Sequence, residues 1–405
     1  MVSKARKPSI KPFKATHFNP SKVKSYSKVV CPPYDVISKA HLACLRERSQ
    51  FNFSHLLITD KGGYAAVGRK LNEWLKSKVL IDDDKDCFYL YEQAFKVGKK
   101  TFKRYGVLSL LRMEKKDIFP HEYTLSAPKV DRKKMIRAVK ANLSPIFCIA
   151  VKPVRTLKNI YLSFSAKKPF ASFKDEEGIH NRVWKIFDKR DIEKISQAFN
   201  KAKLVIADGH HRFEISYDYF LKNKDKFQDL DYVLAFVTDV QEGLLILPTH
   251  RVISLDESKD SFIRKAGKYF KLKKVTKGGL ENKLSKAKRF AFGLCWGKEF
   301  FLLELKDAAI LGKIKDKSYR NLDTYVFHQL VLPLFKTSGG IKYTHSLNEA
   351  ASMVKGTAAA FILRPATLKA VFSISSKGCR LPQKSTYFYP KLTSGIVVRR
   401  FLKHG

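Results

Sequence analysis

The chain has 405 residues, of which 44% are apolar and 12% aromatic, as in folded globular proteins and unlike disordered ones. Lys and Arg outnumber Asp and Glu by 79 to 37, which gives a formal net charge of +42. No apolar run has the length of a membrane span and no hydrophobic stretch follows the basic N-terminus, so the sequence predicts neither a membrane helix nor a secretory signal. The length predicts two or three domains.

The positive charge is spread along the chain and comes more from lysine than from arginine. It predicts nonspecific attraction to polyanions rather than a dedicated nucleic-acid function. The six cysteines are scattered without a Cys-x-x-Cys pair, which argues against a zinc ribbon or a disulfide scaffold and predicts a cytoplasmic protein with reduced thiols. The sequence leaves open whether the chain forms a homo-oligomer.

Hydrophobic periodicity and turn residues predict the elements in chain order. A basic disordered tail over 1–9 precedes Pro32 and Pro33, which stiffen an extended loop presenting Tyr34 and Asp35. The predicted helices cover 38–49, 64–78, a segment ending near 141, 190–200, a segment beginning after Asp208, a basic part of 256–310, 323–335, 347–355 and 366–376. The predicted strands cover 87–95, 101–113, 145–152, 159–163, 203–207, 232–237, 243–247, 290–295, 300–305 and 358–363, with 51–56 as a strand or a turn.

A first group of reactive side chains follows the predicted strand at 101–113. His121, Glu122 and Thr124 place an imidazole, a carboxylate and a hydroxyl within one short span, and Arg132 follows shortly after. For phosphotransfer such a group supplies a base and a metal-facing acid, whereas on a surface loop it is ordinary.

The stretch from Leu204 to Glu214 combines a buried strand, a sharp turn and an amphipathic helix. Asp208 is a good helix N-cap, and Gly209 permits the sharp turn. A helix start has unpaired N–H groups and a partial positive charge that suit an anion, and here it also carries two imidazoles and a guanidinium. The predicted phosphate cradle consists of Gly209, His210, His211 and Arg212. A capped helix start that faces solvent is the structural alternative.

Polar residues also follow the buried strands predicted at 232–237 and 243–247. They are Asp239 after the first strand and His250 with Arg251 after the second. Folds that combine helices and strands often place their sites at the carboxyl ends of buried strands, so these three residues are candidates. Arg251 could equally pair with a surface acid.

The last polar group lies in the aromatic segment between residues 381 and 391. Its side chains could form a second anion clamp, and its members are Lys384, Ser385, Thr386 and Lys391. The alternative is a solvated edge strand whose lysines prevent aggregation.

These motifs occur in the order typical of domain-of-unknown-function family 1015, sometimes labelled ParB-like, and the chain resembles that family over 10–400. The motifs are Cys31–Val36, His121-Glu122 with Thr124, Pro128-Lys129, Asp131-Arg132, Ala207–Arg212, Leu247–Arg251 and Pro382–Lys391. The string from Asp208 to Arg212 also resembles the Asp-Gly-His-His-Arg signature of the ParB/sulfiredoxin superfamily, where it holds a nucleotide or substrate phosphate. Val130, where the family pattern leads us to expect an acid, and the strong basicity depart from the family.

The resemblance implies an α+β fold of mixed sheets with a ParB/sulfiredoxin-like core. The implied domains are an N-terminal α+β segment at 1–85, the core with the phosphate-binding motif at 86–255, and a C-terminal α+β domain at 256–405 that completes the site.

Within the superfamily, the free-serine kinase has the motif nearest in spelling. The resemblance thus implies a nucleotide-dependent phosphotransferase that uses ATP or ADP and Mg²⁺ to phosphorylate a small hydroxyl metabolite, with L-serine as the first candidate. The implied phosphate and nucleotide ligands are Gly209, His210, His211, Arg212, His250, Arg251, Lys384, Ser385, Thr386 and Lys391. The implied catalytic and metal-binding residues are Glu122 or His121 as base, His211, and Asp208 with Asp239 on Mg²⁺, while Tyr34, Asp35 and Arg132 contact the substrate.

Three alternatives stay open. In one of them the chain is not an enzyme. A phosphoserine phosphatase would use the same cradle with water in place of the nucleotide. A ParB-like nucleotide- or nucleic-acid-binding protein without catalysis would agree with the net charge, although no helix-turn-helix follows the cradle. A zinc hydrolase based on His121, His210, His211 and His250 is weaker, because adjacent helical side chains point about 100° apart.

Overall fold

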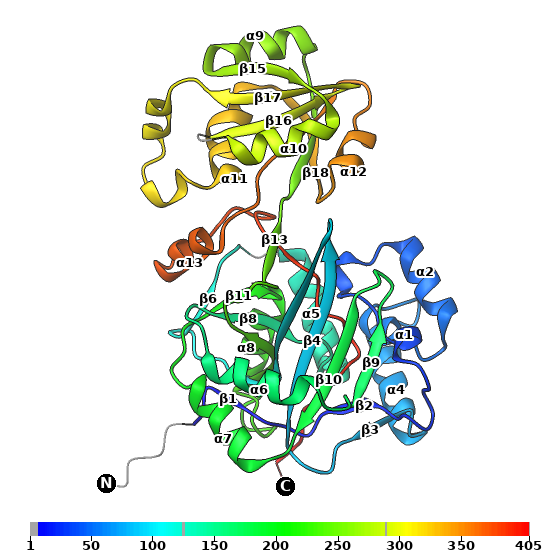
Figure 1. The fold of residues 1–405 in the computed structure, drawn as a ribbon. Coiled ribbons are helices and arrows are strands. Elements are labelled where there is room, and N and C mark those ends of the chain that lie inside the picture. Colours follow the sequence, from blue (N-terminus) through cyan, green and yellow to red (C-terminus); the bar gives the residue numbers. More distant parts are fainter. Residues whose placement is uncertain (1–6, 124–125, 288–289, 405) are drawn as a thin grey trace. The chain divides into compact units, whose positions relative to one another are not determined.

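The computed structural model describes residues 7–123, 126–287 and 290–404. The chain forms two compact units. Unit 1 comprises Met1–Pro120, Thr124–Leu244 and Pro390–Gly405, and unit 2 comprises His121–Tyr123 and Leu245–Tyr389. Both contain helices and sheets, so the predicted α+β class is confirmed (Figure 1). The first six residues of the predicted tail and Thr124 lie outside the described residues.

Unit 1 is built on a mixed sheet that has nine strands among the described residues, in the order β6-β11-β8-β12-β5-β4-β10-β9, with β1 pairing β5. Small two-stranded pairings join β2 to β3 and β7 to β21. The strands are β1 (Ile10–Lys11), β2 (Thr16–Phe18), β3 (Leu80–Asp82), β4 (Phe88–Val97), β5 (Lys100–Arg112), β6 (Ile118–Pro120), β7 (Ala141–Asn142), β8 (Ile146–Ala150), β9 (Ala171–Lys174), β10 (His180–Ile186), β11 (Leu204–Asp208), β12 (Tyr232–Thr238) and β21 (Arg399–Arg400).

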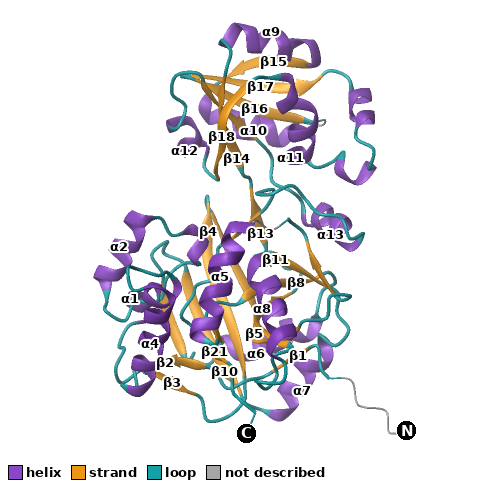
Figure 2. Cartoon of the chain, turned by 180° about the vertical axis from the view of Figure 1, so that it is seen from behind, coloured by secondary structure: helices purple, strands orange, loops and turns teal. Residues whose placement is uncertain are grey.

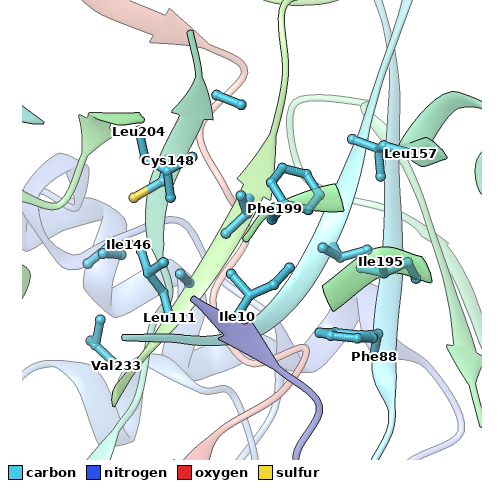
Figure 3. Packing of buried hydrophobic residues seen from close by; sticks show 14 of the residues in the cluster. Ile10, Phe88, Leu111, Ile146, Cys148, Leu157, Ile195, Phe199, Leu204 and Val233 are labelled. Atoms are coloured by element: carbon cyan, nitrogen blue, oxygen red, sulfur yellow. The ribbon is translucent and has the colours of Figure 1, made fainter. Parts of the chain in front are cut away.

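The helices of unit 1 bury their apolar faces in two cores. The helices are α1 (Tyr26–Val29), α2 (Lys39–Arg48), α3 (Ser54–Leu57), α4 (Gly63–Lys76), α5 (Ser126–Val139), α6 (Arg155–Ser165), α7 (Lys189–Ala198) and α8 (His210–Asn223), with a short 3-10 helix at Tyr34–Val36. Helices α6 and α7 cover the sheet with Leu157 and Ile195, which belong to the same core as strand residues such as Phe88 and Ile146 (Figure 3). Helices α1 to α5 enclose a second core around Trp74.

Unit 2 has an antiparallel six-stranded sheet in the order β15-β17-β16-β19-β14-β18 and a separate pair, β13 with β20. The strands are β13 (Leu245–Leu247), β14 (His250–Leu255), β15 (Phe270–Val275), β16 (Ala291–Trp296), β17 (Glu299–Leu305), β18 (Thr337–Thr344), β19 (Ala358–Ile362) and β20 (Tyr387–Tyr389). The helices are α9 (Lys259–Tyr269), α10 (Lys277–Lys286), α11 (Asp323–Val326), α12 (Leu347–Ser352) and α13 (Leu368–Ser376), and short 3-10 or π turns lie at Ala308–Lys313, Lys317–Tyr319, Phe327–Val331 and Leu332–Leu334.

Successive side chains of the unit 2 strands pack alternately in two cores, one on each face of the sheet. Phe292 and Leu294 of β16 pack with Phe262 of α9, whereas Ala291 and Cys295 belong to the core that contains α10 and α12. Because successive strand residues point to opposite faces, a strand buried on both faces needs apolar residues at every position. No helix among the described residues is long and apolar enough to cross a bilayer.

The two units do not follow the predicted domain boundaries at 85/86 and 255/256. β1 pairs with β5, so the N-terminal segment belongs to the same sheet as the predicted core. β14 lies in the sheet of unit 2, so this unit begins before 256. The boundaries of the units depend on which distant strands pair with each other, and hydrophobic periodicity carries no information about such pairing.

Three predicted elements differ from the structure. The segment 159–163, predicted as a strand, lies in α6, where Leu157, Ile160 and Tyr161 form the buried helical face. The segment 51–56 ends in the short helix α3. The basic segment after 256 contains strand β15 between two helices.

Candidate functional site

The turn between β11 and α8 is built around Gly209. Its φ of +88° and ψ of +28° let the chain leave a buried strand and start a helix within one residue. A Cβ here would lie 3.0 Å from Nε of Arg212, so the glycine also makes room for the guanidinium. The prediction that Asp208 caps α8 is wrong: Gly209 is the N-cap, no side chain caps this helix, and Asp208 is the last residue of β11.

The Asp208 carboxylate lies between two cations. Its Oδ2 is 2.5 Å from Nη2 of Arg212, and its Oδ1 is 2.5 Å from Nζ of Lys391. Nη1 of Arg212 donates to the carbonyl oxygen of Pro145. Each terminal nitrogen of Arg212, a predicted phosphate ligand, therefore already has one partner within the protein and keeps a second N–H.

Opposing influences set the pKa of Asp208. Burial raises it, but the positive charges of Lys391, Arg212 and His210 together lower it by more. The pKa therefore lies well below its ordinary value, and the carboxylate stays ionised at neutral pH. Its ion pairs persist down to low pH, because they are lost only as the pH falls through this lowered pKa.

A third cation in electrostatic range is Arg104, which the sequence analysis did not select. Its side chain is fully buried, and Nη2 donates to Oε1 of Gln93 and to the carbonyl oxygen of Pro390. Burial lowers its pKa to about 10, which leaves it charged at neutral pH, and the negative charge of Asp208 opposes that lowering. The sequence offered little signal for this residue, because Arg104 is one of two arginines in the predicted strand at 101–113 and follows Lys103. We call Asp208, Arg212, Lys391 and Arg104 the Asp208 cluster.

Two pockets of unit 1 adjoin the Asp208 cluster. Arg212 lines the first, whose empty volume is about 510 Å³, part of it open to solvent. Its lining is largely apolar and includes Leu57, Met135, Ile136, Leu143, Ile215 and Val233. Lys391 lines the second, with an empty volume of about 400 Å³. Its lining is more polar and includes Arg48, Asp175, Glu176 and Glu177.

Two of the three predicted substrate residues line the first pocket with Arg212. The guanidinium of Arg132 lies 4.2 Å from the ring centre of Tyr34, and its Nε donates to Oδ2 of Asp131 at 2.5 Å. The third residue, Asp35, is exposed on the short 3-10 helix and is not among the residues that line this pocket. Tyr34 and Arg132 therefore remain candidates, with Arg132 already paired to its neighbour.

Asp208 and Asp239, predicted to share a Mg²⁺ ion, lie at opposite edges of the sheet. In the strand registers Asp208 pairs with Phe147 at the start of β8, whereas Thr238 pairs with Ile149 near its end. Because β11 is antiparallel to β8 and β12 is parallel to it, their carboxyl ends are about 10 Å apart along the strands alone. Asp239 instead accepts the N–H of Val154 at 2.6 Å, at the start of α6.

The donor set around Asp208 does not fit a protein-held metal ion. Each carboxylate oxygen already has a cation 2.5 Å away, and Mg²⁺ would have to displace one of them. Within residues 7–123, 126–287 and 290–404, no group of three or more His, Cys, Asp or Glu side chains could hold a metal ion. The strand registers therefore do not bring Asp208 and Asp239 together at one ion, and a metal-binding role for either residue stays a prediction.

In unit 2, the predicted base Glu122 is bound in a backbone nest. Its Oε1 accepts the N–H groups of Ser385 and Thr386, both at 3.1 Å, and the hydroxyl of Thr386 at 2.9 Å. Consecutive N–H groups that point at one place form an anion site. The segment predicted to clamp a phosphate thus holds a carboxylate of the chain itself. His121, with Nε2 at 2.6 Å from Oγ1 of Thr386, is fully buried beside it.

The nest depends on Lys384 and Arg251. Lys384 has a φ of +56°, a left-handed conformation that is unusual for a residue with a side chain. Its carbonyl oxygen accepts Nη2 of Arg251 at 3.1 Å, and Nη1 of the same guanidinium donates to the carbonyl oxygen of Thr249. Arg251 is fully buried, so it holds the loop rather than an incoming phosphate. We call Glu122, Ser385, Thr386 and Arg251 the Glu122 cluster.

His250 is also buried, with 1% of its surface exposed. Burial, together with the charges of Arg251 and His345, lowers its pKa to about 4, so the imidazole is neutral at pH 7. Its Nδ1 accepts the N–H of Leu363 at 3.4 Å. A neutral, enclosed imidazole does not serve as the predicted phosphate ligand.

The comparisons with known proteins identify the family. The model of a family described as protein of unknown function, DUF1015, matches residues 10–325. The chain belongs to this family. The resemblance predicted over 10–400 is thus confirmed for most of its length, and the segment with Lys384 and Lys391 lies beyond the match. No curated protein matches this DUF1015 member.

Several solved structures are similar to this DUF1015 protein. A free serine kinase variant in complex with ADP has 13% identity and a TM-score of 0.36, covering 69% of this chain and 87% of that one. A C-terminally truncated SbnI from Staphylococcus aureus has 11% identity and a TM-score of 0.39, covering 72% and 87%. A conserved hypothetical protein from Pyrococcus furiosus has 15% identity and a TM-score of 0.35, covering 72% and 95%.

The structure divides the predicted site residues into two sets. Unit 1 brings together Asp208, Arg212, Lys391 and Tyr34, with His210 and His211 half-buried at the start of α8. Unit 2 contains the Glu122 cluster with His121, His250 and Lys384. The three cations of the Asp208 cluster and its single carboxylate leave a net charge of +2 beside two pockets. Excess positive charge at an uncapped helix start is suited to an anionic ligand.

Proposed function

We propose that the protein binds the phosphates of a nucleotide at the Asp208 cluster and transfers a phosphoryl group to a small hydroxyl metabolite, with L-serine as the first candidate. The observation that carries the proposal is the surplus of positive charge around Asp208, next to the uncapped start of α8 and to both pockets. Phosphoryl transfer depends mainly on positioning and on neutralising charge, which guanidinium and ammonium groups supply.

The two pockets suit different parts of such a reaction. The apolar lining of the first pocket suits a nucleoside of ATP or ADP, with Arg212 at its edge to face the phosphates. The second pocket contains carboxylates and Arg48, which suit the ammonium and carboxylate groups of an amino acid. The resemblance of the Asp208 to Arg212 string to the free-serine kinase motif supports serine. A ParB/sulfiredoxin-like core is part of the same proposal.

In this proposal the N–H groups of the first turn of α8 and the ammonium of Lys391 bind phosphate oxygens. Asp208 acts as a positioning residue that holds Arg212 and Lys391 in place. A divalent ion would accompany the nucleotide and be held by its phosphates, since both oxygens of Asp208, the one carboxylate of the cluster, are paired with cations. The base stays unassigned in unit 1, and Glu122 and His121 remain the residues predicted for that role.

Titration calorimetry with ADP, ATP and L-serine tests the proposal. Arg212→Ala should weaken nucleotide binding by about 100-fold, the value of one or two charge-assisted hydrogen bonds. Arg155→Ala is the matched control, because Arg155 is also an arginine in the first turn of a helix of unit 1 but is exposed and away from both pockets. Nucleotide affinity that is equal in the two variants would contradict the assignment, provided that thermal unfolding shows both to be folded.

The rivals are separated by activity assays on the same protein. A phosphatase releases phosphate from phosphoserine without nucleotide, whereas a kinase forms phosphoserine only when nucleotide and L-serine are both present. A ParB-like binding protein without catalysis binds nucleotide and forms neither product. Failure to bind any nucleotide or phosphoserine would remove all three functions from the Asp208 cluster.

A further inference from the structure

Helices α4 and α5 of unit 1 lie side by side (Figure 2). Residues of both helices line an open groove that the proposed phosphotransfer does not use. Its empty volume is about 960 Å³, including the part open to solvent. The helices approach closely at Gly68, where a Cβ would lie 2.8 Å from the carbonyl oxygen of Ala138. Small residues therefore line the middle of the groove.

Exposed cations line both sides of this groove. Arg69 comes from α4, Lys134 and Arg137 come from α5, and Lys140 follows the end of α5. Lys134 and Arg137 are three positions apart on α5, so they share one face of that helix. The remaining lining residues are Ala65, Gly68, Asn72 and Ala138, and none of the eight is acidic.

The N-terminal half of α5 differs from the part that lines the groove. There, Lys129 and Lys133 pair with Glu214 and Asp218 of α8 at 2.5 and 2.8 Å. In the part of the chain that the structure describes, Arg69, Lys134, Arg137 and Lys140 form no ion pair. The same helix thus has paired lysines in its N-terminal half, whereas Lys134, which lies 5.9 Å from the ring centre of Tyr64, and Arg137 form no ion pair.

We propose that the groove between α4 and α5 binds the phosphodiester backbone of a nucleic-acid duplex without sequence preference, using Arg69, Lys134, Arg137 and Lys140. Nucleic-acid interfaces are polar and strongly positive, whereas the centre of a protein interface is rich in aromatic and apolar side chains, which this groove lacks. A lipid surface would need apolar groups to insert, but Val67, Leu71 and Trp74 of α4 are buried in the core.

No aromatic side chain lines the groove, which favours a duplex over a single strand as its ligand. Single strands are bound by stacking bases on aromatic rings, whereas a duplex can be bound through its phosphates alone. Four cations that each neutralise one phosphate predict a slope of about −3.6 for the dependence of log K on log salt concentration.

Fluorescence anisotropy with a mixed-sequence DNA duplex of about 20 base pairs, titrated at several salt concentrations between about 50 and 200 mM, tests the proposal. The groove variant combines Arg69→Gln, Lys134→Gln, Arg137→Gln and Lys140→Gln. The matched control combines Lys271→Gln, Lys277→Gln, Lys283→Gln and Lys286→Gln, which remove the same charge from exposed lysines of unit 2 that form no ion pair within the described residues.

The groove variant should bind the duplex more weakly, with a salt slope smaller in magnitude by about 3.6, while the control changes far less. Equal losses in the two variants would show that binding is spread over the whole surface and would overturn the proposal. Tighter binding of polyglutamate or of anionic phospholipid vesicles through the same four residues would also overturn it, in favour of an acidic protein or a membrane. Nucleotide binding at the Asp208 cluster should be the same in all these proteins.

Discussion

The Asp208 and Glu122 clusters both place a carboxylate among converging donors, but the donors differ. Asp208 is paired with the ammonium of Lys391 and the guanidinium of Arg212, and a third cation, Arg104, lies in range. Glu122 accepts two backbone N–H groups and one hydroxyl. The first arrangement leaves excess positive charge beside pockets, whereas the second uses an anion site for a carboxylate of the fold itself. Similar residue types in sequence thus leave excess positive charge in one unit and stabilise a loop of the fold in the other.

The largest expected effect concerns the carboxylate of Asp208. Asp208→Asn leaves two largely buried cations without their counter-charge, and such a loss costs about 4 kcal/mol of unfolding free energy. It also raises the net charge of the cluster from +2 to +3, so inorganic phosphate should stabilise the variant more than the wild type. Denaturant unfolding with phosphate, against chloride at equal ionic strength, measures both effects.

Glu122→Gln is the matching variant in unit 2. It should weaken hydrogen bonds in the nest without creating an anion site, so phosphate should restore none of the lost stability. A phosphate effect of equal size in the two variants would remove the distinction between the clusters.

The next effect is that the stability of unit 2 should depend on pH because of His250. Its pKa is lowered to about 4 in the folded protein, against about 6.5 in the unfolded chain. Between these values the unfolded state binds a proton that the native state excludes, so stability falls as the pH falls, by up to about 3 kcal/mol in total. Above pH 7 the contribution vanishes.

His250→Asn removes this titration and keeps a side-chain oxygen that can accept the N–H of Leu363. Its unfolding free energy should depend less steeply on pH between about 6.5 and 4. Asp208, whose pKa is also lowered, loses stabilisation only at lower pH, so unit 2 should weaken first on acidification. An identical pH dependence in His250→Asn and the wild type would contradict the account of a neutral, enclosed imidazole.

The smallest expected effects come from alanine substitutions at two helical glycines, one in close contact with a neighbouring helix and one with free space around it. In α4 of unit 1, Gly68→Ala brings a methyl group within 2.8 Å of the carbonyl oxygen of Ala138 and should cost about 2 kcal/mol. In α9 of unit 2, Gly267 has no heavy atom within 4 Å of the position of a Cβ, so Gly267→Ala should stabilise by about 1 kcal/mol. Thermal unfolding measures whether each variant is less or more stable than the wild type. Stabilisation by Gly68→Ala would show that α4 and α5 can separate.

The sequence by itself determined the local structure of the candidate site. An apolar run followed by Asp-Gly and a helical pattern predicts a strand, a turn and a helix, and β11, Gly209 and α8 are found there. The spacing of Val67, Leu71, Trp74 and Leu75 predicts one apolar face of α4, and the structure buries the first three and half-buries Leu75. Such features were predictable because they depend on residues a few positions apart. The family, too, was recognised from short motifs in order.

Only the tertiary structure decided which polar groups meet. Lys391 reaches Asp208 across 183 positions, and Lys384, seven residues before it, belongs to the other unit. Asp239 follows a buried strand as Asp208 does, but the two strands run in opposite directions and place the carboxylates at opposite edges of the sheet. Strand direction and the path of the chain between units depend on pairing over long distances, which periodicity does not encode. For that reason the sequence could name candidate polar residues for the site, but only the fold determined which of them lie together.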